Sequence, residues 1–148
     1  VKELCEKAMI NKSTFYSHFA DLYALSEDLE TQTANDILAS LDRPEEIFSK
    51  PEEFNRRLFY AYLAHESLIQ TLFSGSRSTL LLVRIESSLK EVIFSIRPEY
   101  KDDPAANIVL TYGIYGGFYA FQKCRRFGDD AIVEVIASLN KKITELLE

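Results

Sequence analysis

A short run near the start of the chain concentrates side chains that can form hydrogen bonds with a nucleic acid. It holds an amide, a lysine, three aliphatic hydroxyls, a phenol and an imidazole: Asn11, Lys12, Ser13, Thr14, Tyr16, Ser17 and His18. Each of these groups can reach a phosphate oxygen or a base edge. The chemistry that this run could perform is therefore recognition of a DNA groove.

Two short helices must position these groups. Leu4, Cys5 and Ala8 fall on one helical face, a break follows at residues 9–12, and Phe15 and Phe19 stand four apart on a second helix. We expect Ser13 or Thr14 to accept a hydrogen bond from the free amides that open this helix. Ile10 in the turn would fill the space between the two helices. The second helix would turn its phenylalanines inward and its polar groups outward.

A plainer interpretation also fits these residues. Two short amphipathic helices with a turn are common in all-α proteins. Alone, His18 is more often a surface or capping histidine, and Tyr16 is more often a half-buried packing residue.

The same residues resemble a known family. Leu4-Cys5, Ala8 and Ile10, then residues 13–19 and Ala24-Leu25, are similar to the helix-turn-helix of TetR-family bacterial regulators, dimeric repressors that bind operator DNA and release it on ligand binding. The string Phe15-Tyr16-Ser17-His18-Phe19 is the most specific part. The resemblance implies that some side chains face bases or nearby phosphates and that others hold the DNA backbone. The first set is Lys12, Ser13, Thr14 and Ser17, and the second is Tyr16 and His18.

Two positions depart from the family pattern. Met9 stands where the family usually has a glycine in the turn, so it must adopt a positive φ at some cost or the turn must adjust. Leu22 replaces a lysine that usually binds phosphate. The family also has a helix before this one, so we expect further chain to precede Val1.

Composition favours an all-α protein. The chain has 148 residues, 47% of them hydrophobic and 27% charged, with five glycines and four prolines, and it can bury a core of ordinary size. The net charge is −6, but residues 1–20 carry three lysines against two glutamates, or +1, which leaves −7 for the remainder. A small DNA-binding head on an acidic body fits this distribution.

The sequence indicates neither a metal centre nor an enzyme. Cys5 and Cys124 are far apart, with no cysteine or histidine nearby at metal-ligand spacing. Reduced thiols and the lack of a signal peptide suggest a cytoplasmic protein. Because no nucleophile-base pair or phosphate loop is visible, we expect no catalytic residue and no cofactor.

A connector helix should run from residue 21 or 22 to about Leu41. Its ends are apolar and its middle, residues 30–36, is polar, so we expect a solvated centre and a domain boundary there. The predicted domains are a DNA-binding head, residues 1–30, and a ligand-binding and dimerisation body, residues 31–148. Such a connector could transmit a tilt.

Helices fill the predicted body. One should start at Pro51 and continue to Leu72 with a break near His65, and another should be capped by Ser76 or Ser78 and end before Pro98. On this second helix we expect Arg84 to be solvated. Residues 97–103 are expected to form a charged loop without structure of its own.

Residues 104–122 contain no charged side chain. A helix that is apolar all round is buried or spans a membrane. The tyrosines and glycines make this segment only mildly hydrophobic, so we expect burial, with Gly113, Gly116 and Gly117 allowing another backbone to approach.

The last helix should follow Gly128, with Asp129 and Asp130 as caps. Its apolar stripe and that of residues 104–122 exceed what one small body can cover, which suggests a homodimer through the two C-terminal helices. In TetR-like proteins these helices form the dimer interface. The body also broadly resembles TetR-type regulators of dihydroxyacetone kinase.

Aromatic residues of the body could wall a pocket for a small apolar or aromatic ligand, although aromatics at helical spacing are usually core. The candidates are Tyr62, His65, Phe73, Tyr112, Tyr115 and Tyr119, with Phe59 and Phe118 beside them. His65 would otherwise be a hydrogen-bonded core histidine. The leading hypothesis is a dimeric repressor that binds a double-stranded DNA operator and is released by such a ligand. The alternative is a TetR-like co-regulator that acts through protein contacts without DNA.

Overall fold

The computed structural model describes residues 1–148, and every regular element in it is helical. This confirms the predicted all-α class. The helices are α1 (Lys2–Lys7), α2 (Lys12–His18), α3 (Leu22–Ala39), α4 (Glu46–Ser49), α5 (Pro51–Ala64), α6 (Glu66–Leu72), α7 (Leu80–Ile96), α8 (Pro104–Cys124) and α9 (Asp129–Thr144). Single 3-10 turns lie at Gly75–Arg77 (η1), Pro98–Tyr100 (η2), Arg125–Phe127 (η3) and Glu145–Leu147 (η4).

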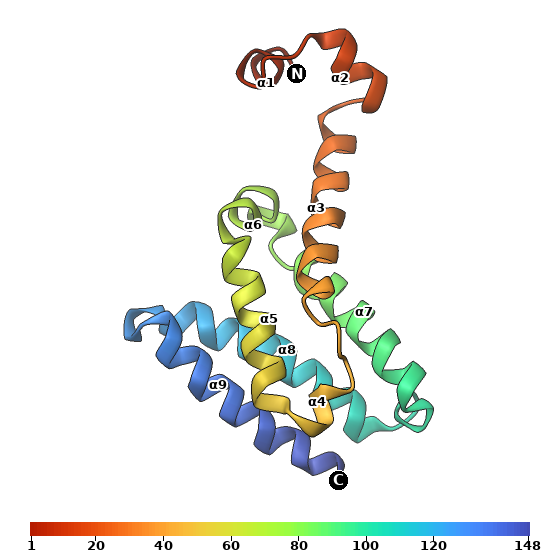
Figure 1. The fold of residues 1–148 in the computed structure, drawn as a ribbon, viewed down its shortest axis with the longest axis vertical. Coiled ribbons are helices and arrows are strands. Elements are labelled where there is room, and N and C mark those ends of the chain that lie inside the picture. Colours follow the sequence, from red (N-terminus) through yellow and green to blue (C-terminus); the bar gives the residue numbers. More distant parts are fainter.

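The two N-terminal helices stand apart from the rest of the molecule (Figure 1). They lie at the outer end of α3, whereas α4 to α9 form a bundle around its other end, and the two chain termini are at opposite ends of the long axis. None of the helices combines the length with the apolar character that a membrane span requires. Helices α1 and α2 are called the head below, and α4 to α9 the bundle.

The middle of α3 is solvated on one face only, where Gln32, Asn35 and Asp36 are exposed as we expected. Glu30, Thr33 and Ala34 in the same stretch are buried, because α3 packs against α5, α6 and α7. Arg77 donates two hydrogen bonds to the Glu30 carboxylate, at 2.7 and 2.6 Å. Arg84, which we expected to be solvated, approaches the same carboxylate at 4.0 Å and donates to the Thr31 hydroxyl. The ion pair lets a polar stretch of helix pack inside the protein.

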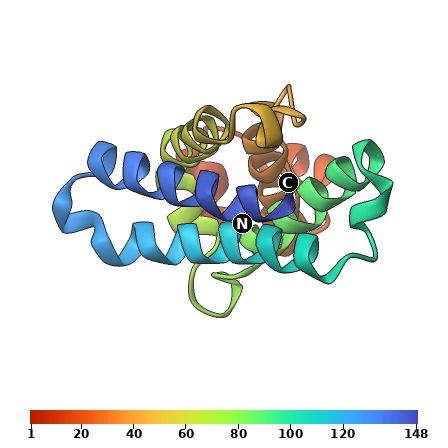
Figure 2. The same ribbon diagram turned by 90° about the horizontal axis from the view of Figure 1, so that it is seen from below.

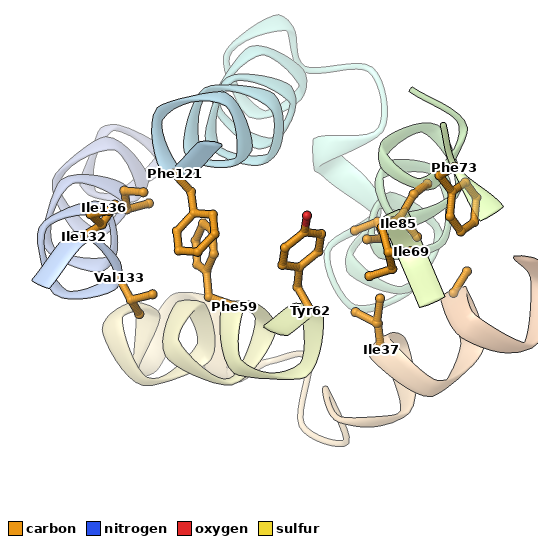
Figure 3. Close-up of a cluster of buried hydrophobic side chains, with 12 residues drawn as sticks. Ile37, Phe59, Tyr62, Ile69, Phe73, Ile85, Phe121, Ile132, Val133 and Ile136 are labelled. Carbon is orange, nitrogen blue, oxygen red and sulfur yellow. The ribbon is translucent and has the colours of Figure 1, made fainter. Parts of the chain in front are cut away.

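The largest core cluster joins the bundle to α3 (Figure 3). The rings of Phe59 and Phe121 pack against each other at a tilt, with centroids 5.3 Å apart, next to Val133 and Ile136 of α9. Tyr62 lies between this aromatic pair and Ile85 of α7. One continuous cluster therefore holds α3, α5, α6, α7, α8 and α9 together.

A second cluster fills the other end of the bundle, where residues 97–103 are more ordered than we predicted. Pro98–Tyr100 forms η2, and Tyr100 is buried against Phe48, with ring centroids 5.6 Å apart. The Arg97 guanidinium lies over both rings. An aromatic anchor and a cation–π contact thus fix a segment that looks merely charged in sequence.

Several local predictions hold and others need correction. The break near His65 is confirmed, since α5 ends at Ala64 and α6 begins at Glu66, and Gly128 separates α8 from α9 at a φ of 92°. No side chain caps α7, which follows Thr79, or α9. The two expected α9 caps have other partners: Asp129 accepts from Arg125, and Asp130 accepts from the Tyr60 hydroxyl.

Helix α8 is buried on one face only. Ile108, Tyr112 and Tyr119 are exposed in the single chain, although we expected the helix to be covered all round. Gly117 does meet a close neighbour, because a Cβ there would lie 3.3 Å from Ile136 Cγ2, but the neighbour is a side chain rather than a backbone. Gly116 faces no other element, so the expected glycine seam is limited to Gly113 and Gly117.

Candidate nucleic-acid interface

Helix α2 begins at a side-chain cap, which is Asn11 and not the predicted Ser13 or Thr14. Asn11 Oδ1 accepts hydrogen bonds from the Thr14 amide at 2.7 Å and from the Thr14 hydroxyl at 2.9 Å. Asparagine in an extended conformation satisfies the free amides at a helix start as well as serine does. The signal for this cap is Asn11 three residues before Thr14, directly ahead of the helix.

One face of α2 is fixed to α1 and the opposite face is free. Phe15 is only 3% exposed and Cys5 of α1 is buried as well, while Phe19 is half-buried. The inward orientation of Phe15 is therefore confirmed. Ile10 in the turn is more exposed than a residue filling the gap between helices should be.

All seven predicted DNA-contacting residues are exposed, and they lie on one short segment of the head. They are Asn11, Lys12, Ser13, Thr14, Tyr16, Ser17 and His18. Two hydroxyls are already engaged locally, since that of Thr14 donates to Asn11 and that of Ser17 donates to the Thr14 carbonyl. Both oxygens keep lone pairs for an incoming donor. Asn11 is engaged as the helix cap, whereas the side chains of Lys12, Ser13, Tyr16 and His18 form no hydrogen bond within the protein.

Lys12 is the only lysine of the head without an ion-pair partner. Lys2 pairs with Glu6 at 3.9 Å and Lys7 pairs with Glu3 at 2.9 Å, both along α1. The net positive charge of the head is therefore located on α2, beside the exposed polar groups. This placement suits attraction to a phosphate backbone.

The turn before α2 has the strain that its sequence predicts. Met9 has a φ of 54°, in the left-handed region, and is the only residue other than glycine with a positive φ. Its side chain is 92% exposed and makes no packing contact that would offset the strain. Leu22 and Tyr23, just after α2, are also exposed.

The aromatic residues proposed as a ligand pocket do not come together. A cavity lies among α4, α5, α7, α8 and α9, but of the six candidates only Tyr62 lines it. Tyr112 and Tyr119 lie on the exposed face of α8, and Phe73 is buried in the core cluster with α3. Burial raises the pKa of Tyr115, and the neighbouring carboxylate of Glu86 raises it further. The predicted set of pocket residues is therefore wrong, because helical spacing alone does not tell which face of α8 points inward.

His65 is tied to the junction of α5 and α6. Its Nδ1 lies 2.9 Å from the Ala61 carbonyl oxygen and its Nε2 lies 3.7 Å from Asp36 Oδ2 on α3. The side chain is half-buried and does not line the cavity. Of the two roles predicted for His65, the structure therefore favours the hydrogen-bonded histidine over the ligand-pocket residue.

The cavity contains residues that sequence reasoning did not select. Asn55 of α5 and Asn140 of α9 are polar positions within apolar stripes, and the Asn140 amide donates to Asn55 Oδ1 at 2.6 Å. An asparagine that interrupts an apolar stripe is the signal that could have found them. No group of three or more His, Cys, Asp or Glu side chains is placed to hold a metal ion.

No family model, curated protein or solved structure matches this chain.

Proposed function

We propose that this protein is a dimeric DNA-binding transcriptional regulator of the TetR type, acting as a repressor. The observation that carries the proposal is the division of α2 into two faces. Phe15 is buried against α1, while all the polar side chains between Asn11 and His18 are exposed around the unpaired Lys12. A helix of this kind fits a major groove, where small polar groups can reach base edges.

The position of the head supports the same function. Helices α1 and α2 project from the bundle on α3 (Figure 1), so the body with its excess of acidic residues does not surround them. A DNA duplex could approach α2 with little repulsion from the body. The attachment of α3 to three bundle helices also gives the head a lever through which the bundle can change its orientation.

A second copy of the chain is needed to read a two-fold symmetric site. Helices α8 and α9 lie side by side at the end of the molecule remote from the head (Figure 2). Both keep large apolar side chains exposed, which are Ile108, Tyr112 and Tyr119 on α8 and Val135 and Leu139 on α9, and Leu146 in the following turn η4 is exposed as well. Pairing these faces between two copies would bury them. To read successive major grooves, the two heads would then have to lie roughly 34 Å apart, one helical turn of DNA.

A mobility-shift titration tests the assignment of α2. The probe is a DNA fragment selected by the protein at low salt, starting with the region upstream of its own gene. We expect Lys12→Ala to weaken binding and to reduce the salt slope by about one, because it removes one phosphate contact. Tyr16→Phe should also weaken binding and leave the salt slope unchanged, since it carries no charge.

Lys101→Ala is the matched control, because Lys101 is an exposed lysine of the acidic body without an ion-pair partner. It should bind DNA like the wild type. If Lys12→Ala and Tyr16→Phe also bind like the wild type, α2 is not the DNA-reading helix.

One observation favours a co-regulator that does not bind DNA. Met9, Leu22 and Tyr23 expose apolar surface on or beside the head, and a protein partner could cover these side chains. This alternative predicts that no genomic fragment is retained at low salt. It also predicts that Tyr23→Ser abolishes retention of a partner protein.

A further inference from the structure

Most of the residues that line the cavity among α4, α5, α7, α8 and α9 are apolar. Eighteen residues line it, fourteen of them hydrophobic and none charged. Its volume is about 70 Å³, several times what a single water requires. Because a charged group would lose its hydration there without gaining a partner, an occupant must be uncharged and mostly apolar.

Three of the polar side chains in the lining lie where α5 and α9 pack together, and these are Asn55, Asn140 and Thr144. The fourth is Tyr62, whose hydroxyl accepts a hydrogen bond from Gln122 Nε2. Asn55 Nδ2 donates to the Pro51 carbonyl at 2.7 Å, and Asn55 Oδ1 accepts from Asn140 Nδ2 at 2.6 Å. A carbonyl oxygen can only accept, so Pro51 fixes the orientation of the Asn55 amide, and Asn55 in turn fixes that of Asn140.

This chain of hydrogen bonds leaves one acceptor free. One N–H of Asn140 Nδ2 donates to Asn55 and the other has no acceptor within the protein, while Asn140 Oδ1 has no donor within the protein. The oxygen faces Gly113 on α8, where a Cβ would lie 3.6 Å from it. The absence of a side chain at Gly113 therefore keeps the space in front of the acceptor open. The Thr144 hydroxyl donates to the Asn140 carbonyl, so it too can only accept from an occupant.

We propose that the cavity binds an uncharged, predominantly apolar molecule with one hydrogen-bond donor, such as a hydroxyl group, which donates to Asn140 Oδ1. The apolar part occupies the space between α5, α7 and α8. Asn55 and Pro51 do not contact the ligand in this arrangement and act by positioning Asn140. Only the idea that this molecule regulates DNA binding rests on the proposed function. Binding of the molecule in the cavity does not require DNA.

Isothermal titration with three probes of equal chain length tests the chemistry. We expect 1-octanol to bind the full chain and to raise its melting temperature. Octyl methyl ether lacks the donor and should bind about fivefold more weakly, the effect of one neutral hydrogen bond. Octanoate is charged at pH 7 and should not bind measurably. Equal affinities for the alcohol and the ether, or no binding of the alcohol, would overturn the proposal.

A pair of glycine substitutions on α8 tests the location. Gly113→Ala places a methyl group at ordinary van der Waals distance in front of Asn140 Oδ1, so the variant should fold, melt no lower than the wild type and bind 1-octanol at least tenfold more weakly. Gly116→Ala adds the same methyl group to the outer side of the helix, where it meets only Tyr112, and should bind like the wild type. Unchanged binding in Gly113→Ala, or equal loss in both variants, would contradict the assignment.

The outcome is separable from that of the DNA-binding test. Binding of 1-octanol without any DNA binding would leave the cavity assignment standing and reject the proposed repressor. DNA binding that is unaffected by 1-octanol, together with no heat of binding, would reject the cavity assignment alone.

Discussion

Glu30 shows how one charged residue can fix a helix against the rest of the protein, even where the sequence of that helix suggests exposure to solvent. The residue is 0% exposed, whereas its partner Arg77 keeps part of its side chain in water. The hydrogen bonds from Arg77 lower the pKa of Glu30, and they outweigh the opposite effect of burial. A lowered pKa means that the folded protein favours the ionised carboxylate more than the unfolded chain does.

We therefore predict a pH-dependent effect of Glu30→Gln. Near neutral pH the free energy of unfolding of the variant should be about 2 kcal/mol lower than that of the wild type, because charge-assisted hydrogen bonds are lost. The difference should be fully present above the ordinary glutamate pKa of about 4.3, and it should shrink as the pH falls through the lower pKa of the folded state. Urea denaturation at pH 7, 5 and 3.5 measures it.

Glu27→Gln provides the comparison, since Glu27 is exposed on the same helix. It should change stability little at any of these pH values. A Glu30→Gln variant as stable as the wild type at pH 7 would show that the pair with Arg77 is not required.

At the scale of elements, the turn between α1 and α2 is the strained connection of the head. Met9 adopts a positive φ although its side chain is almost fully exposed. Left-handed backbone at a residue other than glycine costs on the order of 1 kcal/mol. Nothing in the packing of the side chain offsets this cost.

Replacing Met9 with glycine should stabilise the head by about 0.5–1 kcal/mol, the gain being reduced by the greater freedom of glycine in the unfolded chain. The gain can be measured by hydrogen exchange of the Ile10 amide, which donates to the Cys5 carbonyl across the turn. Protection of this amide from exchange should be about threefold higher in Met9→Gly than in the wild type. Met9→Ala keeps the strained backbone and should show no gain, so equal protection in the two variants would argue against strain at Met9.

At the scale of the whole molecule, the exposed faces of α8 and α9 determine whether the protein works as a pair. Val135 is 69% exposed and Leu139 lies one turn further along the same face. A monomer rarely leaves several large apolar residues exposed on adjacent helices without a use for them. Dimerisation would also link two heads that each carry little positive charge.

We predict that the double variant Val135→Asp, Leu139→Glu is monomeric in sedimentation velocity under conditions where the wild type is dimeric. The variant should keep its helical content, because both positions are exposed in the single chain. Its affinity for DNA should fall at least tenfold, since two linked half-sites become independent. Val83→Asp changes a comparably exposed valine on α7 and should remain dimeric. A wild-type protein that sediments as a monomer at high concentration would refute this assembly.

The order and approximate limits of the helices could be predicted from the sequence because their signals are local. Pro51 at a helix start, Gly128 between two helices and the break near His65 each act within a few residues. The inward face of α2 was equally readable, since Phe15 and Phe19 recur at helical spacing. The chemistry of single residues and the period of an α-helix are sufficient to predict such features.

Only the tertiary structure decided which faces meet. Glu30 finds Arg77 and Asn55 finds Asn140 across 47 and 85 residues of sequence, and the face of α8 that lines the cavity carries Gly113 instead of the tyrosines. These pairings depend on how each helix is rotated about its axis and how it crosses its neighbours. Packing of the complete bundle sets that rotation, so a periodic apolar pattern fixes the position of a helix in the chain but leaves its contacts undetermined.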